Sequence, residues 1–256
     1  MSGWGGFCRC ALIIAHPGHE LHVFGWLAAA KPTVYVLTDG SGRTGVSRLD
    51  STTRLLANVG ARPGRLYGGY LDRAIYDAIL RCDVEFFRQR ARELAEALTS
   101  EGCEFVLSDA ADGTILTHDV WHAVGRAAIG AAEERLRRVI PRFEFAVEGP
   151  GDAPALAGAR RLLLDDQTLR RKLTAARDYR ELKREVEELI ERYGEEAFRT
   201  ETLRPTGQAT NGPHLPKRYE LHGEALAAAG IYPAAVRYEE HVMPILDELL
   251  RMRRAA

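Results

Sequence analysis

The alternation of short apolar segments with amphipathic helical segments is the feature that most restricts how this chain can fold. Apolar runs of strand length occur in "CRCALIIA" (8–15), "TVYVL" (33–37) and "EFVLSDA" (104–110). Helical patterns separate these runs throughout the first 150 residues. Strands separated by helices of this length are typical of βαβ units, which build a mostly parallel sheet. We therefore predict an α/β fold with helices on both faces of the sheet.

Individual segments can be assigned within this pattern. We expect helices over 17–30, 49–59 and 83–100, with Asp83 as the N-cap of the third. A further strand is expected over 142–148. These elements place the predicted sheet in the first 150 residues.

The second part of the chain has a different character. A breaker-rich linker covers 149–158, a long charged helical region follows over 166–197, and a final helix is expected over 236–252. We predict a core over 1–150 and a helical extension over 151–256 that packs over the site, the two forming one compact unit.

Composition narrows the expected partners. Lys and Arg number 35 against 36 Asp and Glu, so no basic excess indicates nucleic acid binding. The sequence contains no run of about 18 apolar residues, so it predicts no membrane span. The four cysteines have no CxxC spacing, which is typical of reduced thiols in a cytoplasmic protein. We expect a cytoplasmic protein that acts on a small molecule; oligomeric state stays open.

Two histidine pairs follow predicted strands. His16 and His19 come directly after "ALIIA", and His118 and His122 lie on one face of a helix that begins after the strand at 104–110. In open α/β sheets, ligands bind beyond the carboxyl ends of the strands. A single pair is more often an ordinary polar start of a helix than a site. Two pairs at one edge favour a catalytic zinc, which takes three protein ligands and a water.

The motifs around these histidines resemble those of a known family. "AHPGHE" (15–20) is similar to the AHPDDE signature of the PIG-L/LmbE-like zinc-dependent N-deacetylases, and "THDVWHAVGRAA" (117–128) to their HPDH motif. Further segments, including "TDGSGR" (38–43) and "YELHGEALAAAGIYPAAVRYEEHVMPI" (219–245), look like one divergent branch of that family. The resemblance implies a Rossmann-like sheet, one Zn²⁺ per chain, and removal of N-acetyl groups from amino sugars or related compounds.

The resemblance also implies roles for individual residues. The family's first two zinc ligands fall on His16 and His19. The third falls on Trp121 without a gap, or on His122 with a shift of one residue; we favour His122, because tryptophan cannot ligate a metal. His118 then corresponds to the histidine that stabilises the developing oxyanion.

One part of the family's machinery is missing from this chain. The position of the general base holds Gly18. Water on a metal can reach a pKa of about 7 without a base, but a positioned base typically contributes roughly 10²- to 10⁴-fold. Asp119 and Glu20 are the carboxylates best placed in the sequence to substitute. Both also suit the ordinary role of an acidic residue in the first turn of a helix.

Two further residues are candidates for substrate binding. Arg43 follows the glycine-rich segment "TDGSG" and could bind an anionic group, and His222 lies in the family-like C-terminal segment, which could cover the site. The leading prediction is a zinc-dependent amide hydrolase acting on an N-acylated amino sugar or similar metabolite. The alternatives are a binding protein that has lost the chemistry, and a hydrolase of esters or carbamoyl groups.

Overall fold

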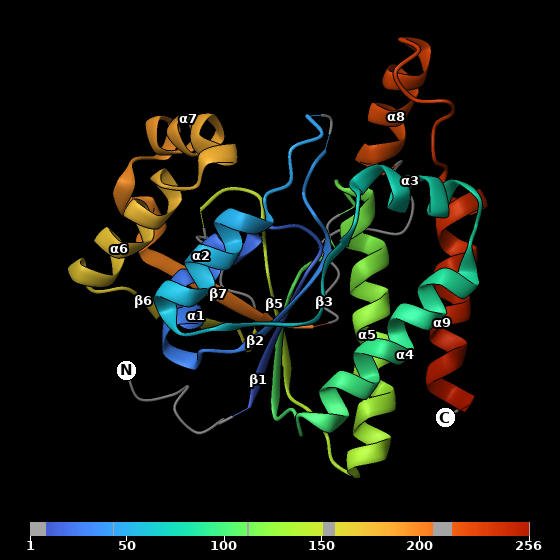
Figure 1. The fold of residues 1–256 in the computed structure, drawn as a ribbon, viewed down its shortest axis with the longest axis horizontal. Helices are drawn as coiled ribbons and strands as arrows, with labels where there is room; N and C mark the ends of the chain where they lie inside the picture. The colour runs from blue at the N-terminus through green and yellow to red at the C-terminus, as the bar shows by residue number, and fades with distance from the viewer. Residues whose placement is uncertain (1–8, 43, 112, 151–156, 207–216, 256) are drawn as a thin grey trace.

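A seven-stranded sheet runs through the molecule in the order β3-β2-β1-β4-β5-β7-β6 (Figure 1). The strands are β1 (Cys10–Ile14), β2 (Thr33–Thr38), β3 (Arg62–Tyr70), β4 (Phe105–Asp109), β5 (Arg142–Phe145), β6 (Arg160–Leu163) and β7 (Thr200–Pro205). The first five strands pair in parallel, and β7 is antiparallel to both of its neighbours. This confirms the predicted α/β class with a mostly parallel sheet.

The computed structural model describes residues 9–42, 44–111, 113–150, 157–206 and 217–255. Its α-helices are α1 (Phe24–Ala30), α2 (Leu49–Val59), α3 (Asp72–Leu80), α4 (Val84–Ser100), α5 (Leu116–Leu136), α6 (Asp166–Arg177), α7 (Lys183–Tyr193), α8 (Arg218–Ala228) and α9 (Met243–Ala255). Short 3₁₀ segments cover His19–Val23, Arg180–Leu182 and Glu195–Arg199, and a π-helical turn, Tyr238–Val242, leads into α9. No helix in these described ranges is both long and apolar enough to cross a membrane.

Helices cover both faces of the sheet, as Figure 1 shows. Alternate residues of a strand point to opposite faces. Accordingly, Ala11 and Ile13 of β1 pack in one core with α4, α5 and α9, while Leu12 and Ile14 pack in a second core with α1 and α2. All four side chains are buried. Packing on both faces therefore fixes β1, the strand that leads into the loop with His16 and His19, which we call the histidine loop.

Several expected elements agree with the structure, and others differ from it. The helix expected over 49–59 is α2, and the Asp83 side chain caps α4 by accepting a hydrogen bond from the backbone N–H of Phe86 at 3.1 Å. The region 166–197 is divided between α6 and α7, not continuous. The break allows Tyr179 to bury its ring against the core that contains α1 and α2.

The second part of the chain contributes strands as well as helices. β7 pairs with β5, and β6 extends the sheet beyond it. Glu201 of β7 is buried and accepts hydrogen bonds from the backbone N–H groups of Gly25 and Trp26 and from Lys172 of α6. A buried charge needs such partners. These contacts attach the extension to the core beside the histidine loop.

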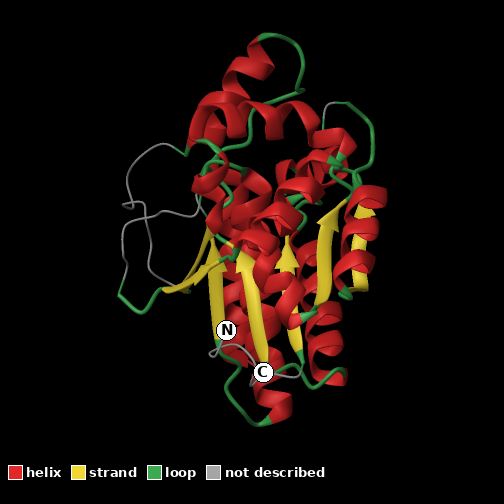
Figure 2. Cartoon of the chain, turned by 90° about the vertical axis from the view of Figure 1, so that its left-hand side faces the viewer, coloured by secondary structure: helices red, strands yellow, loops and turns green. Residues whose placement is uncertain are grey.

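The strand order brings the carboxyl ends of β1 and β4 together. In Figure 2 the arrowheads of the parallel strands point toward one end of the molecule. The chain moves from β1 to β2 on one side, whereas β4 lies on the other side of β1. Such a reversal leaves a crevice between the two strand ends, where open α/β sheets bind ligands. The loops after β1 and β4 both open into this crevice.

Candidate metal centre

Three side chains with metal-binding groups converge at the crevice. His19 comes from the loop after β1, Asp109 is the last residue of β4, and His118 lies in the first turn of α5. One potential ligand atom of each lies within 4.8 Å of the other two. Donors around a single zinc ion each lie about 2.0–2.2 Å from it, so this spacing is close to that of a shared ion.

The carboxylate of Asp109 organises the group. Its Oδ2 accepts hydrogen bonds from the backbone N–H of Ala15 at 2.7 Å and from His19 Nδ1 at 2.8 Å. Burial alone would raise the pKa of Asp109, but these hydrogen bonds and the nearby imidazoles outweigh it and lower the pKa. Among the described residues, its buried Oδ1 has no hydrogen-bond partner. An unpaired buried carboxylate oxygen is costly, and a cation would satisfy it.

The two imidazoles are held against each other and against this carboxylate. The rings of His19 and His118 are 4.8 Å apart and perpendicular, and His118 is fully buried. Burial lowers the pKa of His19 to about 4, with the neighbouring histidines adding to the effect and Asp109 opposing it. Neutral imidazole is the form that ligates metals. Two imidazoles and a carboxylate suit zinc, with a position left for water or substrate.

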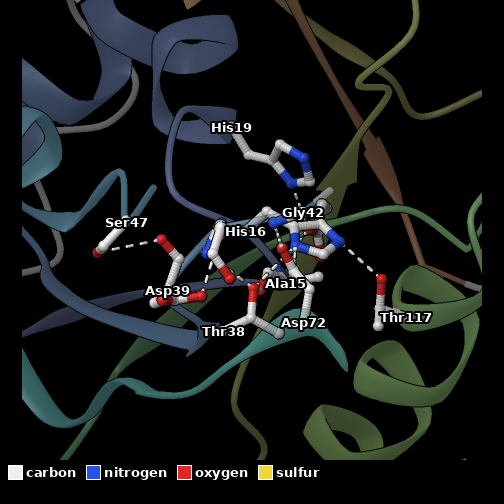
Figure 3. A network of polar contacts seen from close by, with 12 residues as sticks. Ala15, His16, His19, Thr38, Asp39, Gly42, Ser47, Asp72 and Thr117 are labelled. Atoms are coloured by element: carbon white, nitrogen blue, oxygen red, sulfur yellow. Dashed lines mark hydrogen bonds and ion pairs between the residues drawn. The ribbon is translucent and has the colours of Figure 1, made fainter. Parts of the chain in front are cut away.

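His16 lies beside this group but has other partners. Its Nδ1 is 2.9 Å from Thr38 Oγ1 and 3.0 Å from Asp72 Oδ1, and its Nε2 is 2.6 Å from Thr117 Oγ1 (Figure 3). The His16 ring is 5.3 Å from the ring of His19 and 5.4 Å from that of His118. Both ring nitrogens of His16 therefore already have hydrogen-bond partners. These contacts do not favour the metal-ligand role that the sequence predicted for His16.

Asp72 is a site residue that the sequence did not indicate. It begins α3, directly after the end of β3, and so reaches the same edge of the sheet. Burial alone would raise its pKa, but hydrogen bonds from His16 and Thr38 and from the backbone N–H of Gly42 outweigh it and lower the pKa to about 2. Asp72 is thus ionised at neutral pH and faces His16.

His122 does not join His16 and His19, although the sequence placed it in one ligand set with them. One turn further along α5 than His118, it hydrogen-bonds Glu144 of β5 through Nε2 at 3.1 Å. Arg204 of β7 bonds the other oxygen of the same carboxylate. Trp121, the other candidate position, is buried in the core with α4 and α9. In the helix register found here, it is His118 that reaches the carboxyl end of β1.

The two expected substitutes for the missing base lie outside the group. Glu20 is fully buried, and its oxygens accept hydrogen bonds from the backbone N–H of Gly18 at 2.8 Å and from Thr52 Oγ1 at 2.7 Å. Asp119 accepts a hydrogen bond from the backbone N–H of Gly113 at 3.1 Å. Both contacts hold loops in place, so we do not assign either carboxylate to proton transfer.

The expected substrate-binding residues have different outcomes. Arg43 lies outside the described residues, so its role stays a prediction. We call His19, Asp109 and His118 the metal group. His222 of α8 lines a cavity of about 620 Å³ that reaches this group at His19. The cavity is also lined by His16, His19, Asp72 and Thr117. Of the residues labelled in Figure 3, these four therefore lie where a substrate can reach them.

The buried histidines predict acid sensitivity of the metal-free protein. Burial lowers the pKa of His22 to about 3, as it lowers that of His19 to about 4. The unfolded chain therefore binds more protons than the folded chain below pH about 6.5. We expect the free energy of unfolding to fall between pH 6.5 and 4 by up to about 1.4 kcal/mol per pH unit for each histidine.

Urea unfolding at pH 7, 6 and 5 in the presence of a chelator measures this slope. In His22→Gln one of the two groups is gone, so the slope should be roughly half that of the unmodified chain. An unfolding free energy that stays constant from pH 7 to 5 would contradict the buried neutral state of these imidazoles.

Comparisons with known proteins show which solved structures share this fold. No family model matches the chain, and no curated protein matches it. Solved structures do match. The zinc-inhibited form of teicoplanin deacetylase Orf2 is 15% identical with a TM-score of 0.53, covering 80% of this chain and 100% of its own. The A40926 pseudoaglycone deacetylase Dbv21 is 19% identical with a TM-score of 0.51, covering 77% and 96%.

A further match is the conserved protein TT1542 from Thermus thermophilus. It is 17% identical with a TM-score of 0.52, and the match covers 82% of this chain and 99% of that one. At these identities the likeness establishes a shared fold.

Proposed function

We propose that this chain is a zinc-dependent hydrolase of the N-deacetylase type, which removes an acyl group from a small polar substrate such as an N-acylated amino sugar. The observation that carries the proposal is the convergence of His19, Asp109 and His118 beside an open cavity that His19 lines. The resemblance of "AHPGHE" to the deacetylase motif supports it. So does the shared fold with two proteins named as deacetylases.

His19, Asp109 and His118 would hold the cation. A zinc ion supplies Lewis acidity toward a carbonyl oxygen and lowers the pKa of water. His19 Nδ1 and Asp109 Oδ2 lie 2.8 Å apart, so a cation bound by both atoms would replace the hydrogen bond that joins them.

His16 is the proton acceptor that we propose in place of the missing base. With Asp72 ionised and 3.0 Å away, the proton of neutral His16 belongs on Nδ1, and Nε2 is left as the acceptor. Nε2 faces the hydroxyl of Thr117 in the wall of the cavity. A proton taken from the attacking water at Nε2 gives an imidazolium that Asp72 stabilises, and the same proton can pass to the leaving amine nitrogen.

Acetate release from a panel of N-acetylated amines and sugars, with and without zinc, tests this function. We expect turnover that needs the metal. His16→Gln should keep zinc binding but lose roughly 10²- to 10⁴-fold in turnover. Asp72→Asn should lose less, because it leaves Nε2 in place. Turnover that is unchanged by chelation would contradict the proposal.

A binding protein without turnover is the alternative that one observation favours. A side chain at Gly18, the family's base position, would meet Leu182 at 2.5 Å, so that route to a base is closed. Zinc-dependent binding of N-acetylated ligands with no acetate released from any of them would support this alternative and exclude the hydrolase.

A further inference from the structure

The cavity above the metal group has two unlike parts. Next to the metal group its wall is polar, with the imidazoles of His16 and His19 and the hydroxyl of Thr117. Elsewhere, apolar and aromatic side chains of α3, α5, α8 and the segment after α8 line it: Tyr76, Ile115, Leu116, Tyr219, Ile231, Tyr232, Pro233 and Val236. We call the four residues Tyr76, Ile231, Tyr232 and Pro233 the apolar wall.

The apolar wall is held in place by contacts of its own. The rings of Tyr76 and Tyr232 are 4.6 Å apart and tilted by 38°. Tyr76 donates a hydrogen bond from its hydroxyl to the carbonyl oxygen of Ala234 at 2.8 Å. Aromatic pairs of this kind add to the stability of a packed surface. The wall is therefore a fixed surface, formed where α3 contacts the segment after α8.

The apolar wall and Ile115, which lines the same cavity, leave apolar area open to solvent. Ile231 is 54% exposed and Ile115 is 38% exposed, although both line the cavity. Exposed apolar groups gathered at one place mark a surface that a ligand or partner covers. Because these groups lie inside a cavity that also reaches the metal group, the occupant that fits is part of the substrate.

The size of the cavity agrees with a substrate of two parts. Its volume of about 620 Å³ lies in the range of pockets that enclose drug-sized ligands. A substrate with an acetyl group as its one apolar part would leave the wall uncovered. An apolar group of the size of an aromatic ring or a medium-length alkyl chain would cover it.

We propose that the substrate is an amphiphilic amide, whose apolar group lies on the apolar wall while its amide lies at the metal group. The position of the amide rests on the hydrolase function proposed above, whereas binding of the apolar group does not. In the reaction, water adds to the amide carbon and the C–N bond breaks, so that one product is a carboxylic acid and the other an amine. The apolar group stays with whichever product carries it.

Hydroxamates of increasing chain length test the proposal with the metal present. In zinc-loaded protein, we expect affinity to rise about two- to fourfold per methylene from acetohydroxamate to octanohydroxamate, because each methylene leaves water for the wall. Benzohydroxamate should also bind more tightly than acetohydroxamate. Calorimetry gives these affinities without any need for turnover.

A second series separates the wall from the metal. In chelator-treated protein, octanamide should bind more tightly than acetamide, since this gain does not need zinc. Ile231→Ser and Tyr232→Ala should each reduce the gain with chain length. Leu163→Ser serves as the matched control, because Leu163 is 71% exposed on β6 and does not line the cavity.

The two proposals can fail separately. Equal affinity across both series, or a gain with chain length that Ile231→Ser and Tyr232→Ala leave unchanged, overturns the apolar wall as a binding surface. A gain with chain length in the amides, together with protein that takes up no zinc, supports the wall and removes the hydrolase function.

Discussion

We expect His118→Ala to abolish stoichiometric zinc binding and His122→Ala to retain it. His118 is fully buried with its ring 4.8 Å from that of His19, while His122 is bonded to Glu144 outside the group. Loss of a ligand should weaken zinc affinity by more than about 100-fold, since even partners of ligands change metal affinity 10- to 100-fold. Metal analysis after dialysis against micromolar zinc, with circular dichroism to verify folding, measures the effect.

A second variant shows whether a loss of zinc comes from a missing ligand or from misfolding of His118→Ala. Asp109→Asn preserves the shape of the side chain but removes the charge, and it should also lose zinc. The proposed ligand set is contradicted if His122→Ala loses the metal and His118→Ala keeps it. That result would restore the ligand set expected from the sequence.

We expect Gly18→Asp to destabilise the protein without increasing turnover, although it restores the residue that the deacetylase motif carries at this position. Gly18 has a φ of +106°, where a residue with a side chain is strained by about 1–3 kcal/mol. The new Cβ would lie 2.5 Å from Leu182 Cδ1. The new carboxylate would also stand beside Glu20, whose pKa burial already raises. We expect a loss of about 3 kcal/mol or more in the free energy of unfolding.

Urea unfolding of a double-mutant cycle measures how much of this destabilisation comes from the contact with Leu182. Leu182→Ala makes room for the new side chain, so Gly18→Asp should be less destabilising in that background than in the unmodified chain. A Gly18→Asp protein of unchanged stability that releases acetate faster would contradict this reading of the loop.

The fold could be predicted to the extent that hydrophobic pattern determines it. β1 is an uninterrupted apolar run and β4 begins with three apolar residues, because both faces of these strands are covered by helices. The edge strand β6 has no such pattern, since its side chains are mostly exposed. The break between α6 and α7 could not be predicted either. It depends on a distant contact, the hydroxyl of Tyr179 bonding Thr52 of α2 at 2.7 Å.

The candidate site could be predicted as a place but not as a set of contacts. The sequence placed His19 and His118 at the correct edge of the sheet, because they follow strands. It favoured His122 as the ligand and gave His118 another role, because the two histidines share one face of α5 and the pattern does not show which of them reaches the end of β1. Asp109 was hidden as the last residue of an apolar strand, and Asp72 begins a helix that the pattern did not reveal.

Anomalous diffraction at the zinc edge from crystals grown with zinc tests the proposed metal centre most directly. We predict one ion, with a nitrogen of His19, a nitrogen of His118 and an oxygen of Asp109 each about 2.0–2.2 Å from it. An ion bound by His16 and His122, or no ion at the carboxyl ends of β1 and β4, would contradict this ligand set.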